Sequence, residues 1–396
     1  MTTTKPVNSE INTFVSQRAN SIAPSGIRKF FDLLASIDDV ISLGVGEPDY
    51  TTPWNIREAA IYSLERGRTM YTSNIGMPEL RKELSLHLEQ CYGLHYNPDS
   101  ELLITVGVSE ALDLAMRATI NQGDQVLMGA PCYVAYPASV LLSSGEPVMI
   151  PTNEANCFEL DPMNLESAIT SSCKAILSGY PANPTGAVLP HEKMLQIADV
   201  ARRHNLIVMS DEIYSNLVYG VEHTCFASLP GMQERTILMG GFSKAYAMTG
   251  WRIGYAAGPR EIISAMTKIH QYTIMCAPTM AQVAAIEALR NGNNSMKEMV
   301  ADYNRRRQLI VSGLRSIGFS CFEPKGAFYA FPNISITGLS SEIFAEKLLQ
   351  EERVAVVPGT AFGQCGEGYI RCCYATSIPE LEEALVRIKR FVDNHR

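Results

Sequence analysis

The sequence predicts an α/β fold in which helices cover both faces of a mostly parallel β-sheet, followed by a smaller α+β unit. Between residues 100 and 260, helical patterns such as Ser109–Ile120 and His191–His204 alternate with short apolar runs of strand type. These runs are Leu102–Val106, Gln125–Met128, Ala175–Leu177, Leu206–Met209 and Thr236–Met239. Apolar runs without polar alternation are typical of parallel strands that are buried on both faces.

The composition is that of a globular protein, with 396 residues, 46% of them hydrophobic, and a formal net charge of −8. This length is enough for two or three domains with large cores. A mildly acidic chain argues against binding to nucleic acids or anionic membranes. No stretch approaches the ~18–20 apolar residues of a membrane helix, and the first twenty residues lack the apolar core of a secretory signal. We therefore expect a cytoplasmic protein with no nucleic-acid or membrane partner.

The ten cysteines and seven histidines do not form a metal-binding pattern. No two cysteines are spaced as CxxC, and no histidines are spaced as HxxxH. We expect no metal site, and we interpret the cysteines as small, mostly buried side chains.

The pattern changes near residue 290, which predicts a division of the chain into three parts. Helical patterns and short strand-like runs alternate after that point: Ser295–Ile317, Phe328–Phe331, Ser340–Glu351, Val354–Val357 and Tyr369–Tyr374. We expect a large domain at 46–288 and a small C-terminal α+β domain at 289–396. The N-terminal segment, 1–45, is expected to pack on the small domain. The arginine run at 305–307 is interpreted as a solvated helix face.

Unusual polar residues follow each of the five predicted strands. They are Gly107–Glu110, Pro131–Tyr133, Pro181–Gly186, Asp211–Tyr214, and Ser243–Lys244 with Arg252 shortly beyond. Each group alone could be turn chemistry or solvated charge. Because the carboxyl ends of parallel strands meet at one edge of a sheet, where ligands of such folds bind, we expect the five groups to surround one site.

The first of these groups is suited to bind a phosphate. Gly107–Glu110 opens a helix after a strand, so free N–H groups and the helix dipole attract an anion there. The hydroxyls of Ser109 and Ser243 and the forked guanidinium of Arg252 can add donors. The segment lacks both GxxxxGK[ST] and GxGxxG, so a P-loop or dinucleotide site is not indicated.

The other groups are suited to hold an aromatic cofactor. Asp211 ends an apolar strand, where a carboxylate is costly unless a cation such as a protonated pyridine nitrogen accompanies it. Asn183 and Tyr214 can hydrogen-bond a phenolic oxygen, and Tyr133 can stack on a ring. Lys244 can form an imine if its pKa is lowered. Together these groups predict a site for pyridoxal 5′-phosphate (PLP).

Seven segments extend this prediction to most of the chain. They are GEPDY (46–50), YTSNIGMPELR (71–81), NPTG (183–186), SDEIY (210–214), GGFSKAYAMTGWRIGY (240–255), GAFYAFP (326–332) and YIRCCYATS (369–377). In these segments the sequence resembles the class I/II aminotransferases, which are fold-type I PLP enzymes. It looks nearest to the bacterial and archaeal alanine, aspartate and aromatic aminotransferases. FSK followed by MTGWRIG is the most specific part of the resemblance.

The resemblance implies roles for individual residues. The cofactor contacts would be Val108, Ser109, Glu110, Tyr133, Asn183, Asp211, Tyr214, Ser243, Lys244, Arg252 and Tyr71. Lys244 would hold PLP as a Schiff base and carry the proton, with Asp211 and Tyr214 as its catalytic partners. Arg371 would bind the substrate α-carboxylate, together with the Gly46 backbone and Asn183. Tyr71 would reach the phosphate of a neighbouring subunit, which implies a homodimer with shared active sites.

The activity implied is ping-pong transamination between an L-amino acid and a 2-oxo acid such as 2-oxoglutarate. The amino acid would be of the alanine, aspartate/glutamate or aromatic type. Some aspartate-preferring relatives carry a basic residue at the position of Ser109, so strict dicarboxylate specificity is not implied. Two alternatives stay open at this point: another PLP reaction on the same fold, such as a C–S β-lyase, and a non-catalytic regulator.

Overall fold

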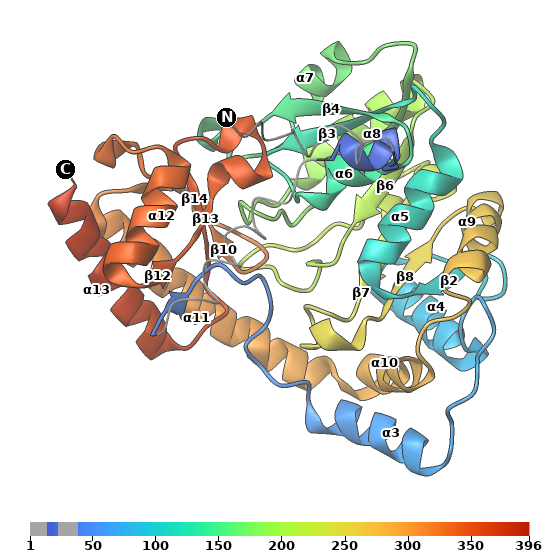
Figure 1. Ribbon diagram of the computed structural model, residues 1–396. Coiled ribbons are helices and arrows are strands. Elements are labelled where there is room, and N and C mark those ends of the chain that lie inside the picture. Colours follow the sequence, from blue (N-terminus) through green and yellow to red (C-terminus); the bar gives the residue numbers. More distant parts are fainter. Residues whose placement is uncertain (1–13, 23–38, 396) are drawn as a thin grey trace, which may run out of the picture.

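The structure is a computed structural model that describes residues 14–22 and 39–395. The ribbon has two parts, a large one built around a sheet and a smaller C-terminal one in orange and red (Figure 1). Of the N-terminal segment expected to pack on the small part, residues 1–13 and 23–38 lie outside the described residues. Within the described ones, α1 (Gln17–Asn20) is a short helix, and β1 (Ile41–Ser42) pairs in parallel with β12 (Val354–Ala355) of the small part.

A seven-stranded sheet forms the centre of the large part, in the order β2-β8-β7-β6-β5-β3-β4. Its strands are β2 (Leu102–Thr105), β3 (Gln125–Ala130), β4 (Glu146–Pro151), β5 (Cys173–Ser178), β6 (Ile207–Asp211), β7 (Thr236–Gly241) and β8 (Gly254–Ala257). β8 runs antiparallel to both of its neighbours, β2 and β7, so these two point the same way as the remaining strands. The predicted α/β fold with a mostly parallel sheet is confirmed, and the carboxyl ends of all five predicted strands lie at one edge.

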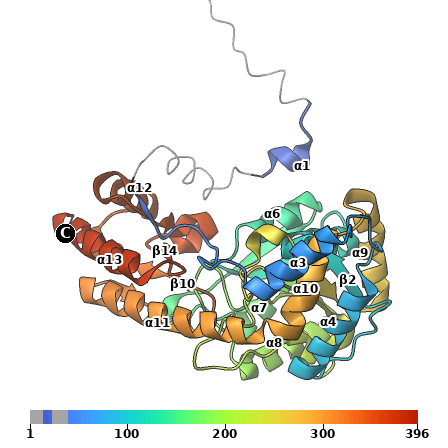
Figure 2. The same cartoon turned by 90° about the horizontal axis from the view of Figure 1, so that it is seen from below.

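Alternation along the strands explains why helices cover both faces. Val126 and Met128 of β3 belong to a core cluster with α5, α6 and α9, whereas Leu127 between them packs with α7 and α8 on the other face. α4 and α10 pack on β2 and β7 from the same side as α7 and α8. The helices are α3 (Trp54–Glu65), α4 (Pro78–Tyr92), α5 (Gly107–Thr119), α6 (Ala135–Leu142), α7 (Pro162–Ser167), α8 (His191–Arg203), α9 (Arg260–Thr273) and α10 (Thr279–Asn291). Figure 2 shows α3, α4 and α10 grouped on the large part.

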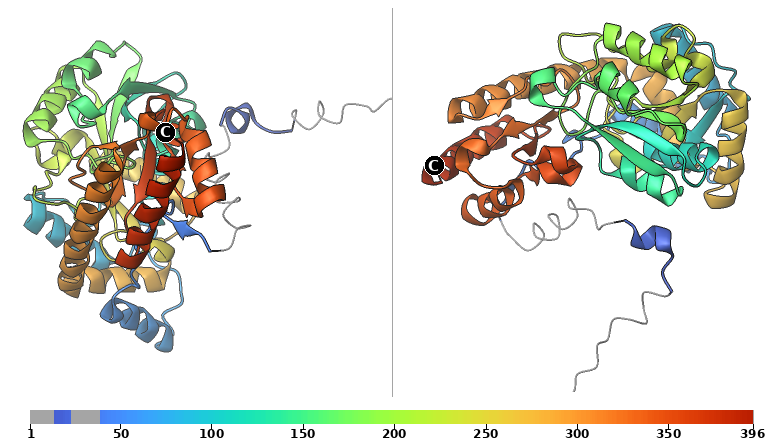
Figure 3. Two further views of the ribbon diagram at one scale, coloured as in Figure 1. Left: turned by 90° about the vertical axis from the view of Figure 1, so that its left-hand side faces the viewer. Right: turned by 90° about the horizontal axis from the view of Figure 1, so that it is seen from above.

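The small part is an α+β unit. Its elements are α11 (Asn293–Ile317), β9 (Ser320–Cys321), β10 (Tyr329–Ala330), β11 (Pro332–Asn333), α12 (Ser341–Glu352), β12, β13 (Val357–Pro358), β14 (Ile370–Cys373) and α13 (Ile378–Asn394). β10, β14 and β13 form an antiparallel sheet. Helices α11 and α13 lie side by side (Figure 3). The predicted boundary at residue 288 falls in the last turn of α10. Helices α10 and α11 meet at Gly292.

Two connections run between the large and small parts. One is the segment from Leu43 to Thr52, which leaves β1 beside the small part and leads to α3 of the large part (Figure 1). The other is α11, which contacts α10 at one end and α13 along its length.

The arginine run contradicts its interpretation as a solvated face. Arg305 is exposed, but Arg306 and Arg307 are each only 7% exposed. They lie on the side of α11 that packs against the rest of the molecule, where Arg306 pairs with Asp49 and Arg307 with Glu323. Among the ten cysteines, all free, five are buried. Within the described residues, no helix is long and apolar enough to cross a membrane.

Candidate active site

A cavity of about 520 Å³ lies beyond the carboxyl ends of the five strands. Its lining brings together a residue or more from each polar group that the sequence places after a strand. The lining residues are Val45, Gly46, Glu47, Val108, Ser109, Leu112, Tyr133, Val134, Tyr136, Pro181, Asn183, Asp211, Ile213, Tyr214, Ser243, Lys244, Thr249, Arg252, Tyr329 and Arg371. The edge of the sheet therefore carries one polar site, as expected from the topology.

The N-terminus of α5 and Arg252 form an anion-binding corner of the cavity. Gly107 has φ +75°, and a Cβ there would lie 2.6 Å from the Arg252 guanidinium. Glycine at this position lets the arginine approach the backbone at the start of the helix, beside Val108 and Ser109. Arg252 also donates to the Thr249 carbonyl at 2.9 Å. Free helix N–H groups and a fixed guanidinium are the donors that bind a phosphate.

Asp211 lies at the end of β6 and is 6% exposed. Its carboxylate accepts hydrogen bonds from the Tyr136 hydroxyl at 2.9 Å and the Ile213 N–H at 3.2 Å. Burial raises the pKa of this carboxyl to about 6, against these two hydrogen bonds, which lower it. A cation beside Asp211 would offset that desolvation, so the side chain fits the role of partner to a protonated ring nitrogen.

Lys244 follows β7 and places its amine in the cavity. Desolvation lowers the pKa of Lys244 to about 8, with Arg371 and Arg252 adding to that effect. Nζ donates to the Gly46 carbonyl at 2.6 Å and lies over the rings of Tyr214 and Phe328. An amine with a lowered pKa, held at one place, is suited to attack a carbonyl.

Arg371 projects from β14 of the small part into the same cavity. Its guanidinium donates to Asn183 Oδ1 at 2.9 Å and to the Gly44 carbonyl at 2.6 Å, and it lies over the rings of Tyr329 and Phe362. The buried Nε has no hydrogen-bond partner among the described residues. A positioned arginine with a free donor is suited to bind a carboxylate.

The cavity also contains tyrosines to which the sequence analysis gave no role. Tyr136 supports Asp211, and its ring packs edge-on against Tyr133. Tyr136 is the second residue of α6, whereas Tyr133 lies two residues before that helix, so helical spacing did not indicate the pair. Tyr329, from GAFYAFP, shares a hydrogen bond of 2.7 Å with Tyr214. Burial raises the pKa of both Tyr214 and Tyr329 well above the usual value, so each stays a neutral phenol.

Two residues predicted to contact the cofactor lie outside the cavity lining of the described chain. The carboxylate of Glu110 points away from it, accepting from the Val106 N–H at 2.5 Å and pairing with the buried His270 at 2.7 Å. The Glu110 side chain therefore holds the start of α5, and the contact of Glu110 with the cofactor stays a prediction. Tyr71 is 81% exposed and does not reach the cavity of its own chain.

The residues present fit PLP. Helix N–H groups beside Arg252, a buried carboxylate, a tyrosine ring, an amine with a lowered pKa and a second arginine surround one cavity of about 520 Å³. Fold and site together define a PLP-dependent enzyme. Residues 38–388 match the family described as Aminotransferase class I and II, and the chain belongs to that family. It is thus an aminotransferase that uses PLP.

Relatives cover nearly the whole chain. YugH of Bacillus subtilis (strain 168), whose name assigns it to the aminotransferases, is 54% identical over 96% of this chain and 99% of its own. The aspartate aminotransferase of Pyrococcus abyssi (strain GE5 / Orsay) is 45% identical, with coverage of 95% and 97%. The crystal structure of the aromatic aminotransferase from Pyrococcus horikoshii OT3 superposes with a TM-score of 0.89 at 42% identity, with coverage of 93% and 99%. These relatives favour transamination over a C–S lyase or a regulator.

Proposed function

We propose that this aminotransferase moves the amino group between an L-amino acid of the aspartate/glutamate, aromatic or alanine type and a 2-oxo acid such as 2-oxoglutarate. The observation that carries the proposal is that Arg371, Asp211 and Lys244 line one cavity. A carboxylate bound at Arg371 would place the adjoining Cα near the Lys244 amine, which can then move the Cα proton. Two such half-reactions in succession give a ping-pong mechanism.

In this proposal Arg371 binds the α-carboxylate, and Asn183 and the backbone at Gly46 complete that subsite. The contact between Arg371 and Asn183 at 2.9 Å holds the guanidinium in one orientation. Lys244 removes the proton from the substrate Cα and returns it, as a general base and then a general acid. A pKa of about 8 keeps part of the amine neutral at pH 7.

The cofactor contacts are proposed on the same geometry. When bound, PLP supplies an electron-withdrawing ring that stabilises negative charge at Cα. Asp211 keeps the ring nitrogen protonated, and Tyr133 packs against the ring. Asn183 and Tyr214 donate to the ring oxygen. The phosphate binds at Val108, Ser109, Ser243 and Arg252, at the anion-binding corner described above.

A homodimer with shared sites is part of the proposal. Large apolar side chains are exposed around α3 and the Tyr71 loop: Trp54, Ile61, Tyr62, Leu64, Met70, Tyr71, Tyr272, Ile274 and Met275. The loop is tied to the α9–α10 connection by Asn74, which donates to the Met275 carbonyl at 2.8 Å, and by Thr279, which donates to the Met70 carbonyl at 2.7 Å. Exposed patches of this kind are typical of protein interfaces. A second copy covering the patch would bring Tyr71 to the partner's phosphate.

The substrate class is proposed from the names of two relatives and from the charged residues that line the cavity. The P. abyssi relative is named for aspartate and the P. horikoshii one for aromatic amino acids. Among the described lining residues the cations are Lys244, Arg252 and Arg371, each with a role already proposed. A distal carboxylate would therefore rely on hydroxyls such as Ser109 or on the second subunit. A cytoplasmic location remains a prediction from the N-terminal sequence.

A half-reaction screen tests the substrate class. The PLP-loaded protein is mixed with each of twenty amino acids, and the change in cofactor absorbance is followed. We expect fast conversion with glutamate and with aspartate or aromatic amino acids, the last two being the classes for which relatives are named. Conversion that needs no keto acid and releases ammonia from cystathionine would contradict the proposal in favour of a lyase.

A further inference from the structure

The Leu43–Thr52 segment contacts two of the three cations that the proposed function uses, Arg371 and Lys244. Its Gly44 carbonyl accepts from Arg371 at 2.6 Å, and its Gly46 carbonyl accepts from Lys244 at 2.6 Å. The segment has no regular secondary structure between β1 and α3. The contacts that hold the backbone of this segment therefore also fix the positions of the two carbonyl groups that accept from Arg371 and Lys244.

The segment is fastened at both ends by neutral hydrogen bonds. At the start, the Cys373 N–H donates to the Leu43 carbonyl at 2.7 Å, and the Leu43 N–H donates to the Ala355 carbonyl at 2.8 Å. At the far end, the Thr52 hydroxyl donates to the Ala247 carbonyl at 2.5 Å. Between these ends, the Asp49 carboxylate accepts from the Arg306 guanidinium at 2.7 Å. This charged contact joins the segment to the middle of α11, so the two connections between the large and small parts are linked to each other.

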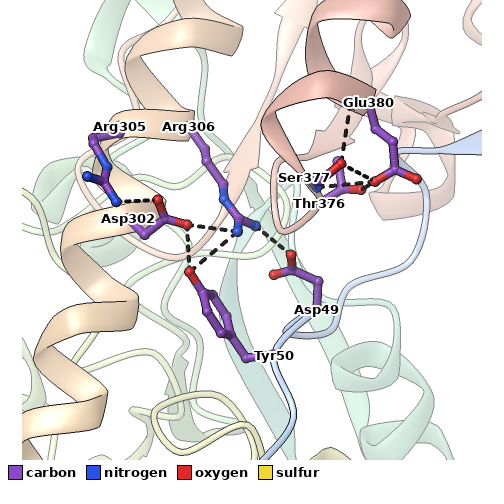
Figure 4. Close-up of polar contacts among 8 residues, drawn as sticks. All are labelled: Asp49, Tyr50, Asp302, Arg305, Arg306, Thr376, Ser377 and Glu380. Carbon is purple, nitrogen blue, oxygen red and sulfur yellow. Dashed lines mark hydrogen bonds and ion pairs between the residues drawn. The ribbon is translucent and has the colours of Figure 1, made fainter.

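Arg306 is held by a set of groups on three sides, shown in Figure 4. Its second carboxylate partner is Asp302, one turn earlier on α11, at 2.7 Å. The Tyr50 hydroxyl donates to the same Asp302 oxygen at 2.6 Å. The guanidinium lies over the rings of Tyr50 and Tyr303, at 5.3 and 5.5 Å from their centroids. Glu380, at the start of α13, is the further acidic group near the cluster, and its carboxylate accepts from Thr376 and Ser377.

Removing the Arg306 guanidinium would turn the attraction between Asp49 and α11 into a repulsion. A buried arginine is stable only when it is paired, and its loss leaves the partner charges uncompensated. Asp302 would keep its pair with Arg305 at 2.6 Å, but Asp49 would lose its partner, and the two carboxylates would face each other without the guanidinium that now lies between them. Their repulsion would push the segment that carries Asp49 away from α11, and the Gly44 and Gly46 carbonyls would move with it.

We propose that Arg306 is a positioning residue of the active site: through Asp49 it fixes the Leu43–Thr52 segment where the Gly44 and Gly46 carbonyls meet Arg371 and Lys244. Arg306 itself lies outside the cavity lining and contacts neither reacting group. The inference rests on the proposed function, because it assigns the effect of Arg306 to the binding of the substrate carboxylate and to the reactive amine.

The test compares Arg306→Gln with Arg307→Gln in the full-length, PLP-loaded protein. Arg307 is an equally buried arginine one residue further along α11, and it donates to Glu323 and to the Pro324 carbonyl at 2.8 and 3.1 Å. In Arg306→Gln we expect KM for the amino acid to rise between about ten- and a hundredfold, with a smaller change in kcat, because a displacement of about 1 Å at a positioning contact has effects of that size. In Arg307→Gln we expect KM near that of the unchanged protein.

A second measurement does not depend on turnover. The pH dependence of PLP capture by the apoprotein reports the state of the Lys244 amine. Loss of the Gly46 acceptor removes a hydrogen bond to the charged form, so the profile of Arg306→Gln should shift to lower pH. Arg306→Lys, which keeps a charge near Asp49, should restore part of both the KM and the profile. Equal profiles for Arg306→Gln, Arg307→Gln and the unchanged protein would overturn the inference.

A double variant tests the path through Asp49. Asp49→Asn alone should raise KM, but added to Arg306→Gln it should lower KM, because it removes one of the two repelling carboxylates. Effects that multiply independently would contradict the path, since residues that act through one contact are not additive. If Arg306→Gln fails to fold, Arg306→Lys and Asp49→Asn provide the same comparison. An unchanged protein that binds PLP but does not transaminate would refute the proposed function, whereas an active one in which Arg306→Gln has unchanged KM would refute this inference alone.

Discussion

At the scale of single residues, burial favours the neutral form of both Lys244 and Asp211. It lowers the pKa of the amine to about 8 and raises that of the carboxyl to about 6. The two shifts serve opposite purposes. A neutral amine is ready to react, whereas a carboxyl with a raised pKa is ready to pair with a cation when one enters.

The rate of PLP capture by the apoprotein should therefore depend on pH with a midpoint near 8. Only the neutral Lys244 amine attacks a carbonyl, so the rate should rise up to about pH 8, level off above it, and fall roughly tenfold per pH unit well below it. Stopped-flow absorbance across pH 5.5–9.5 measures this. Lys244→Ala should show neither the fast absorbance change nor turnover. A midpoint near 10.5, the ordinary pKa of lysine, would contradict the assignment.

Asp211→Asn should stabilise the apoprotein at neutral pH while weakening its hold on PLP. The pKa of Asp211 rises from 3.8 to about 6 on folding. Its ionisation therefore opposes folding increasingly between pH 4 and 6, and fully above that. At pH 7 the gain for the variant should be on the order of 2–3 kcal/mol, since each pKa unit corresponds to about 1.4 kcal/mol.

Chemical denaturation of the parent and Asp211→Asn apoproteins at pH 4 and pH 7 measures the predicted difference in the free energy of unfolding. The variant should match the parent at pH 4 and exceed it at pH 7. With saturating PLP the order should reverse, because only Asp211 offers a charge partner to the ring nitrogen. A variant that is less stable than the parent in both apo measurements would contradict this account of Asp211.

At the scale of elements, the start of α5 carries the anion-binding corner. Gly107→Ala should lower the affinity for PLP about tenfold or more. The new Cβ would lie 2.6 Å from the Arg252 guanidinium, and φ +75° is strained for alanine. Gly123→Ala is the matched control, since Gly123 has φ +85° and no atom within 4 Å of the new Cβ. Equilibrium dialysis with PLP measures both, and equal losses would show that backbone strain alone is responsible.

The sequence predicted the strands that are recognisable from a short apolar run. All five apolar runs are strands, with ends that differ by up to two residues from those expected. β4 and β8 were missed. In β4 the apolar residues Val148–Ile150 stand between two prolines, and in β8 Tyr255 stands among glycine and alanine residues, so neither run has the pattern of a typical strand. Antiparallel β8 also explains why Arg252 enters the cavity from the beginning of a strand rather than from the end of one.

Side chains whose importance depends on tertiary contacts could not be predicted. The RRR run looks like one exposed stripe, yet the turn of α11 sends Arg305 to solvent and Arg306 to Asp49. Glu110 has the sequence position of a cofactor ligand, but its carboxylate is taken by His270, which is 160 residues away in the chain. Such pairings depend on how α9 and α11 pack, which no spacing rule fixes.

At the scale of the whole molecule, Tyr71 suggests a test of the shared site. Tyr71→Ala and Lys244→Ala should each be impaired, because one lacks the donor to the partner's phosphate and the other the amine. When the two are unfolded together and refolded, half of the dimers should be hybrids, and each hybrid should carry one complete site. We expect activity to recover to roughly a quarter of that of the parent protein. No recovery in a mixture shown to be dimeric would contradict a site shared between subunits.

The contact between Arg371 and the Gly44 carbonyl joins residues 327 positions apart. The closure of so long a loop comes late in folding, because its entropy cost is met only once intervening contacts exist. Half-folded chains would thus present the sheet edge without the arginine or the crossing segment. The absorbance of captured PLP would then report the last stage of folding, and it would change later than the burial of the aromatic core.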